Sequence, residues 1–94
     1  MNYNDGNEIY YIVAKNIKKY RKEKNMTQKE LTEKTLYSVG FISNIESEKY
    51  LQTFSLGTVW VIANALDVSP SKLLDFECDE NDNPIIDVEQ FLRK

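Results

Sequence analysis

The chain has 94 residues, of which 41% are hydrophobic and 29% are charged. This length allows one compact domain, and no apolar run approaches the roughly 20 residues that a transmembrane helix needs. The sequence has no histidine, only three glycines and a single cysteine, which argues against the usual general base, a glycine-rich phosphate loop and a cysteine zinc site. We therefore expect a non-enzymatic protein without metal or cofactor. The lone Cys78 favours a reducing, cytoplasmic location.

Charge is distributed unevenly along the chain, although the net charge is only −3. The segment 1–50 contains nine basic and seven acidic residues, whereas the segment 51–94 contains three basic and eight acidic residues. Six of the basic residues lie between Lys15 and Lys24. Such a stretch can bind phosphates even on an acidic protein, because salt screens charges beyond roughly 10 Å. The charge pattern alone fits solvent-exposed faces equally well.

Apolar residues at helical spacing predict an all-α chain, since no segment alternates apolar and polar residues over a strand length. The first helix is expected to start near Asp5 or Asn7 and to end near Asn25. Its apolar stripe consists of Ile9, Val13, Ile17 and Tyr20.

Two short helices are expected next. Thr27 and Glu30 have the spacing of a capping box, so the second helix starts at Gln28 and extends to about Thr35. Ser38 offers an N-cap for a third helix. The buried side of that helix is formed by Phe41, Ile42 and Ile45. Two helices of about eight residues, separated by about three, are typical of a helix-turn-helix.

The second half of the chain predicts two further helices and a C-terminal addition. A fourth helix follows Ser55, and a short fifth helix starts at Ser69 and Pro70. The apolar face of the fourth helix consists of Leu56, Val59, Ile62, Ala63 and Leu66. After an acidic segment over residues 75–84, a second capping box at Asp87 predicts a short last helix. The apolar cluster around this helix is either an extra packing element or a dimerisation arm.

Residues from about Ile17 to Leu74 resemble the Xre-type helix-turn-helix family, the DNA-binding domain of phage repressor and Cro proteins. The matching stretches are, in order, Arg21-Lys22-Glu23-Lys24-Asn25-Met26-Thr27-Gln28-Lys29-Glu30-Leu31, Phe41-Ile42-Ser43-Asn44-Ile45-Glu46 and Ile62-Ala63-Asn64-Ala65-Leu66-Asp67-Val68-Ser69. The resemblance implies a five-helix repressor-like domain over residues 1–76, here with an extended first helix. Residues 77–94 would then form an acidic linker and the short extra helix.

The resemblance makes the helix after Ser38 the recognition helix, which lies in the major groove of DNA. Base contacts are then expected from Val39, Gly40, Ser43 and Asn44. Asn44 suits adenine and Val39 suits a thymine methyl group, while the lack of Arg and Lys in this set predicts little preference for guanine. Phosphate contacts are expected from Gln28, Lys29, Ser47 and Lys49.

Arg21 and Glu46 occupy positions that are paired in the resembling family. The pair would tie the first helix to the end of the recognition helix, as a structural and not a catalytic contact. Four residues depart from the family pattern: Leu36 replaces a turn glycine, Thr32 a small alanine, Glu48 a glycine and Thr53 a proline. Leu36 implies either a strained residue or a different turn, because a left-handed backbone disfavours bulky side chains.

Trp60 and Val61 point away from the apolar face of the fourth helix, which suggests an interface with a second copy. The alternative is that Trp60 covers Tyr10 or Tyr11 of the first helix, or the C-terminal tail. The expected dimer interface consists of Trp60, Val61, Phe91 and Leu92.

Together these features predict a transcriptional regulator that binds specific sequences of double-stranded DNA. It is expected to act as a homodimeric repressor at a palindromic operator, because symmetric sites usually bind symmetric dimers. The alternative is an antitoxin-like interaction module, which binds a protein partner through its acidic tail and binds DNA only as a subsidiary activity. No membrane association is expected.

Overall fold

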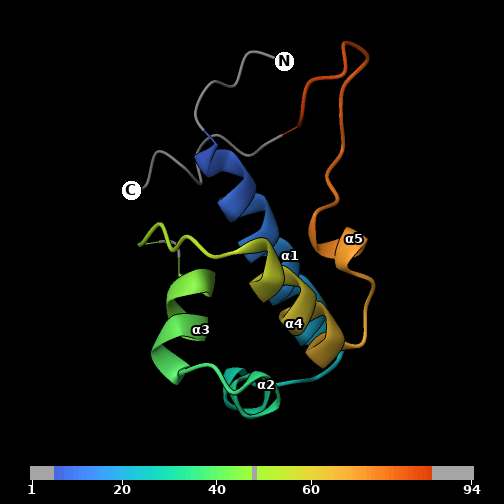
Figure 1. Cartoon of the computed structure of the whole chain (residues 1–94). Helices are drawn as coiled ribbons and strands as arrows, with labels where there is room; N and C mark the ends of the chain where they lie inside the picture. Colours follow the sequence, from blue (N-terminus) through green and yellow to red (C-terminus); the bar gives the residue numbers. More distant parts are fainter. Residues whose placement is uncertain (1–5, 48, 86–94) are drawn as a thin grey trace.

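The computed structural model describes residues 6–47 and 49–85, which form five α-helices (Figure 1). The helices are α1 (Asn7–Glu23), α2 (Gln28–Thr35), α3 (Val39–Glu46), α4 (Leu56–Leu66) and α5 (Pro70–Leu73). The long helix α1 contacts α3, α4 and α5, and α2 packs against α3 and α4. The all-α prediction is confirmed, and the observed helix bounds lie close to the expected ones. None of the described helices is long and apolar enough to cross a membrane.

Capping side chains set the helix starts that the sequence predicts. The Thr27 hydroxyl accepts from the Glu30 N–H at 3.0 Å, and the Glu30 carboxylate accepts from the Thr27 N–H at 3.3 Å. Ser38 and Ser55 accept from the N–H groups three residues later in α3 and α4. Each such cap stabilises a helix by about 1 kcal/mol, because it pairs a backbone donor that the helix itself leaves free.

The core lies where the inner faces of all five helices meet. Its buried apolar residues are Val13, Ile17, Leu31, Ile42, Ile45, Val59, Ile62, Ala63, Leu66 and Leu73. Leu56 was expected on this face, but it is 74% exposed, and Ile9 is 36% exposed. The expectation is wrong for Leu56, because this residue stands in the first turn of α4, at the rim of an apolar hollow.

The turn between α2 and α3 contains a left-handed residue although it has no glycine. Leu36 has φ 64° and ψ 13°, and its side chain is 92% exposed. Its N–H donates to the Thr32 carbonyl at 3.0 Å, which closes the end of α2. A left-handed backbone costs a residue other than glycine roughly 1–2 kcal/mol. Of the two expectations, a strained Leu36 or a different turn, the structure therefore shows the strained residue.

Residues 75–85 form an acidic hairpin after α5. The Asp79 carboxylate accepts from the N–H groups of Asn81 and Asn83 at 2.9 and 3.0 Å, which holds the turn. At the open end the Ile85 N–H donates to the Glu77 carbonyl at 2.7 Å. The chain thus returns to the place from which the hairpin departs. The last helix expected from residue 87 lies outside the described residues.

Asn16 of α1 holds the base of the acidic hairpin. Its side-chain amide donates to the carbonyl groups of Leu73 and Asp75 at 2.9 and 2.8 Å. Both bonds satisfy carbonyls at the end of α5, where no helical donor follows. The end of α5 is therefore tied to α1 by a polar side chain as well as by apolar packing.

Candidate nucleic-acid interface

Helix α3 has one face in the core and one face free. Ile42 and Ile45 are buried on the inner side, and the Phe41 ring packs against Tyr37 with the centroids 5.1 Å apart. The residues expected to contact bases are all exposed: Val39, Gly40, Ser43 and Asn44. Figure 1 shows α3 at the edge of the molecule, away from α5 and the acidic hairpin. The outer face of α3 is therefore accessible to a large partner.

Gly40 is not required by the packing of the protein itself. A Cβ added at this position would meet no atom within 4 Å. Glycine also weakens a helix by about 1 kcal/mol relative to alanine. The fold therefore tolerates a larger residue here.

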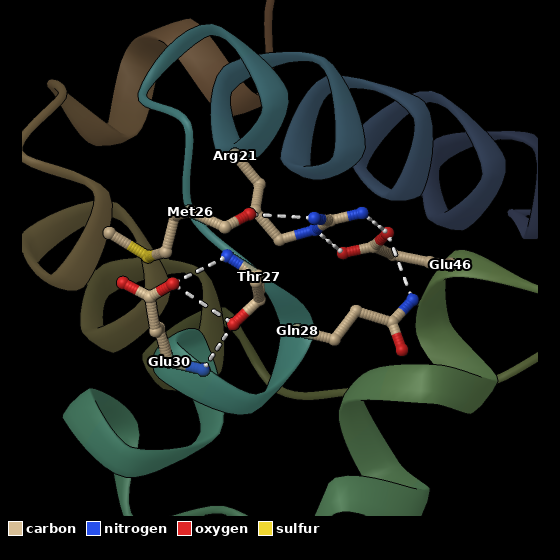
Figure 2. A network of polar contacts seen from close by, with 6 residues as sticks. All are labelled: Arg21, Met26, Thr27, Gln28, Glu30 and Glu46. Carbon is tan, nitrogen blue, oxygen red and sulfur yellow. Dashed lines mark hydrogen bonds and ion pairs between the residues drawn. The ribbon is translucent and has the colours of Figure 1, made fainter.

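A buried ion pair holds α3 against α1 (Figure 2). Arg21 Nε donates to Glu46 Oε2 at 2.8 Å, and Arg21 Nη2 donates to Glu46 Oε1 at 2.8 Å. The side chain of Arg21 is 11% exposed and that of Glu46 only 2%. The two parallel bonds fix the angle between the groups as well as their distance. The structure thus brings together the two residues that the family resemblance pairs.

Two further contacts extend this ion pair into a network. Arg21 Nη1 donates to the Met26 carbonyl at 2.7 Å, and Gln28 Nε2 donates to Glu46 Oε1 at 3.3 Å. The network therefore connects the end of α1, the turn before α2, the first residue of α2 and the last residue of α3, as Figure 2 shows. Because of its bond to Glu46, the pKa of Arg21 is raised above its ordinary value although burial opposes this. The guanidinium stays charged.

The residues expected to contact phosphates lie at the start of α2 and just after α3. Lys29 and Lys49 are exposed, whereas Gln28 and Ser47 are half-buried. The Ser47 hydroxyl accepts from the Lys49 N–H at 3.1 Å, which orders the chain as it leaves α3. Since the network joins the start of α2 to the end of α3, the two groups of candidate contacts are held by one rigid unit. Glu48 lies outside the described residues.

The basic stretch of α1 is only partly free. Lys15, Lys19, Lys22 and Lys24 are exposed, and Lys18 is half-buried. The Lys19 ammonium lies 5.2 Å from the centre of the Tyr20 ring, within the range of a cation–π contact. These lysines contribute positive potential on the helix that carries Arg21, which favours an anionic partner.

Some polar features of this region could not be found by sequence reasoning. The bond between Gln28 and Glu46 joins residues 18 positions apart, and no local pattern predicts it. Thr32 Oγ1 is buried without a hydrogen-bond partner among the described residues, at the position where the resemblance implies a small alanine. An unpaired buried hydroxyl costs about 1–3 kcal/mol.

The surface of α4 carries an exposed tryptophan. Trp60 is 62% exposed and Val61 is 37% exposed. Tyr10 of α1 packs edge-on against Phe54, with the ring centres 5.0 Å apart, and Trp60 remains accessible. Phe91 and Leu92, the other residues expected in a dimer interface, lie outside the described residues.

Comparison with known proteins supports the same fold. The sequence model of a family described as "Helix-turn-helix" matches residues 17–73. A solved structure with a similar fold is that of the hypothetical transcription factor NHTF from Neisseria, with a TM-score of 0.66 and 23% sequence identity. The similarity covers 80% of this chain and 84% of that chain. No curated protein matches the chain significantly.

Proposed function

Because the chain belongs to the Xre-like helix-turn-helix family, we propose that it binds double-stranded DNA through α3 and regulates transcription. The observation that carries this proposal is the exposed outer face of α3 on a helix that the buried ion pair holds in place. A rigid helix with a free outer face fits the major groove of B-DNA, which is wide enough to admit one α-helix.

In this proposal three side chains of α3 contact the DNA bases, and a glycine allows the helix to approach them closely. Asn44 pairs with adenine, Val39 contacts a thymine methyl group, and Ser43 donates or accepts one hydrogen bond. Gly40 lets the backbone approach the bases. Such a set gives modest discrimination without a preference for guanine, which Arg or Lys would supply.

Gln28, Lys29, Ser47 and Lys49 position the protein on the DNA backbone. The Gln28 amide keeps one N–H free when the other donates to Glu46. Contacts of this kind add affinity that falls with salt and do not read bases. The binding constant is therefore expected to fall with salt at every site, while the ranking of sites is unchanged.

The active form in this proposal is a homodimer that represses transcription at a palindromic operator. Support comes from the exposed Trp60 and Val61 on α4, since tryptophan is enriched in the centres of interfaces. Two copies related by a two-fold axis would place two α3 helices in successive major grooves, about 34 Å apart.

Selection of bound DNA from a random pool at two salt concentrations tests the proposed function. An enriched palindromic motif that is the same at both concentrations, with weaker binding at the higher one, is the expected result. The Asn44→Ala variant serves as the matched control and should lose preference at one position of each half-site. A pool without any enriched motif would contradict sequence-specific binding.

A protein-interaction module is the second candidate, and the acidic hairpin is the observation that favours it. Its carboxylates are all exposed: Asp75, Glu77, Asp79, Glu80 and Asp82. Asn16 holds this surface on the side of α1 that carries α5. An acidic surface fixed in this way suits a basic protein partner. Truncation at Asp75 separates the two candidates. Loss of dimerisation together with DNA binding would favour the regulator, whereas loss of partner binding with DNA binding kept would favour the interaction module.

A further inference from the structure

An apolar hollow opens at the end of the molecule where α1 and α4 begin. Its main lining residues are Ile9, Tyr10, Val13, Phe54, Leu56 and Leu74. Leu56 is 74% exposed and Ile9 is 36% exposed, so apolar surface at the rim remains in contact with water. Removal of such surface from water is favourable, which favours the docking of an apolar side chain in the hollow.

The hollow has the size of an aromatic ring. Its volume is about 190 Å³. An apolar cavity of about 150 Å³ is large enough to hold benzene. Its walls include the rings of Tyr10 and Phe54, which lie edge to face with their centres 5.0 Å apart and can receive another aromatic group.

The path of the chain brings a suitable occupant close to the hollow. Leu74 lines the hollow, and Glu77, only three residues later, accepts a hydrogen bond from the Ile85 N–H at 2.7 Å. Three residues span about 11 Å at most. Phe91 follows Ile85 by six residues, which span about 9 Å as a helix or about 20 Å as extended chain. An extended connection of this length is long enough to bring Phe91 to the hollow.

We propose that residues 86–94 dock on this hollow within the same chain, with the Phe91 ring as the inserted group. In the sequence, Val88 follows Ile85 by three residues, and Phe91 and Leu92 follow Val88 by three and four, a spacing typical of one side of a helix. A short connection gives the segment an effective concentration in the millimolar range. At micromolar protein the chain's own segment therefore fills the hollow before a second copy does.

The docked segment adds a C-terminal layer to the fold and covers the first turns of α1 and α4. It assigns Phe91 and Leu92 to the chain's own hollow, so a dimer would use the Trp60 surface without them. The inference is independent of DNA binding, because no residue of the hollow belongs to the candidate interface.

Disulfide cross-linking in a Cys78→Ser background tests the proposal. The pair Leu56→Cys and Leu92→Cys keeps Phe91 in place and should form a disulfide within one chain, which leaves the protein at monomer size on a denaturing gel. The control pair Lys29→Cys and Leu92→Cys should stay reduced, because Lys29 lies on α2. Chains that carry only one of the two cysteines should not cross-link to each other when mixed.

Thermal unfolding provides the second readout. Phe91→Ala should lower the melting temperature by roughly 5–10 °C, whereas Gln90→Ala, its polar neighbour, should shift it by no more than about 1 °C. In a chain that already carries Leu56→Asp, the effect of Phe91→Ala should be at least halved. A disulfide between different chains would overturn docking within one chain. Equal melting temperatures for Phe91→Ala and Gln90→Ala, without any disulfide, would overturn docking altogether.

Discussion

Two regions of the molecule differ in the kind of contact that their side chains make. At the α3 end, a buried network of Arg21, Glu46, Gln28 and the Met26 carbonyl holds three helices in one geometry. At the other end, the first turns of α1 and α4 border an open apolar hollow. Hydrogen bonds between charged groups have fixed directions, whereas apolar contact has none. The polar end therefore specifies an angle between helices, and the apolar end accepts any side chain that fits.

The buried ion pair has a desolvation cost that the apolar hollow does not have. A buried ion pair often stabilises a protein no more than an apolar pair of similar volume, because both charges must leave water. Removal of one partner is nevertheless severe, since the other charge is then buried without compensation. Substitutions in the Arg21–Glu46 network are therefore expected to lower both the free energy of unfolding and the affinity for DNA.

Replacement of Glu46 by Ala is expected to have the largest effect. The change leaves the Arg21 guanidinium buried without its partner and should cost about 3–5 kcal/mol of stability. Gln28 loses its hydrogen-bond acceptor at the same time, so DNA affinity should fall with stability. Denaturant unfolding and DNA titration measure the two effects. Glu33→Ala on the exposed side of α2 is the control, and an unchanged melting temperature for Glu46→Ala would contradict the structural role of the pair.

Asn44→Ala is expected to lower DNA affinity and to leave stability unchanged. Asn44 is exposed, so the free energy of unfolding should change by no more than about 0.5 kcal/mol. Affinity for the selected DNA should fall by about 1–3 kcal/mol through the loss of one base contact. Asn64→Ala, at an exposed position of α4, should change neither quantity. Equal affinities for the Asn44→Ala variant and the unchanged protein would exclude Asn44 from the interface.

Leu36→Gly is expected to give the smallest effect and the opposite sign. Glycine adopts the observed φ of 64° without a steric cost, so stability should rise by roughly 1 kcal/mol. Little packing is lost, because the Leu36 side chain is 92% exposed. Lys34→Gly inside α2 is the control and should lower stability by about 1 kcal/mol. A destabilised Leu36→Gly variant would show that the exposed leucine makes contacts beyond the isolated chain.

Much of the candidate interface could be anticipated from residues close together in the chain. The exposure of Val39, Gly40, Ser43 and Asn44 follows from the helical period once Ile42 and Ile45 are placed in the core. The pairing of Arg21 with Glu46 could not be derived in this way, because 25 residues separate the partners. It came from the family resemblance alone, and the contact of Gln28 with Glu46 came from neither source.

Local sequence fixes where α2, α3, α4 and α5 begin, because their caps join groups only two or three residues apart. The tertiary structure alone decided how far each apolar stripe is covered, which leaves Leu56 exposed while Val59 is buried. It also decided which distant polar groups meet, as in the bonds from Asn16 to Leu73 and Asp75 across 57 and 59 positions. Local periodicity places a side chain on one face of its helix, but the crossing of the helices determines what that face meets.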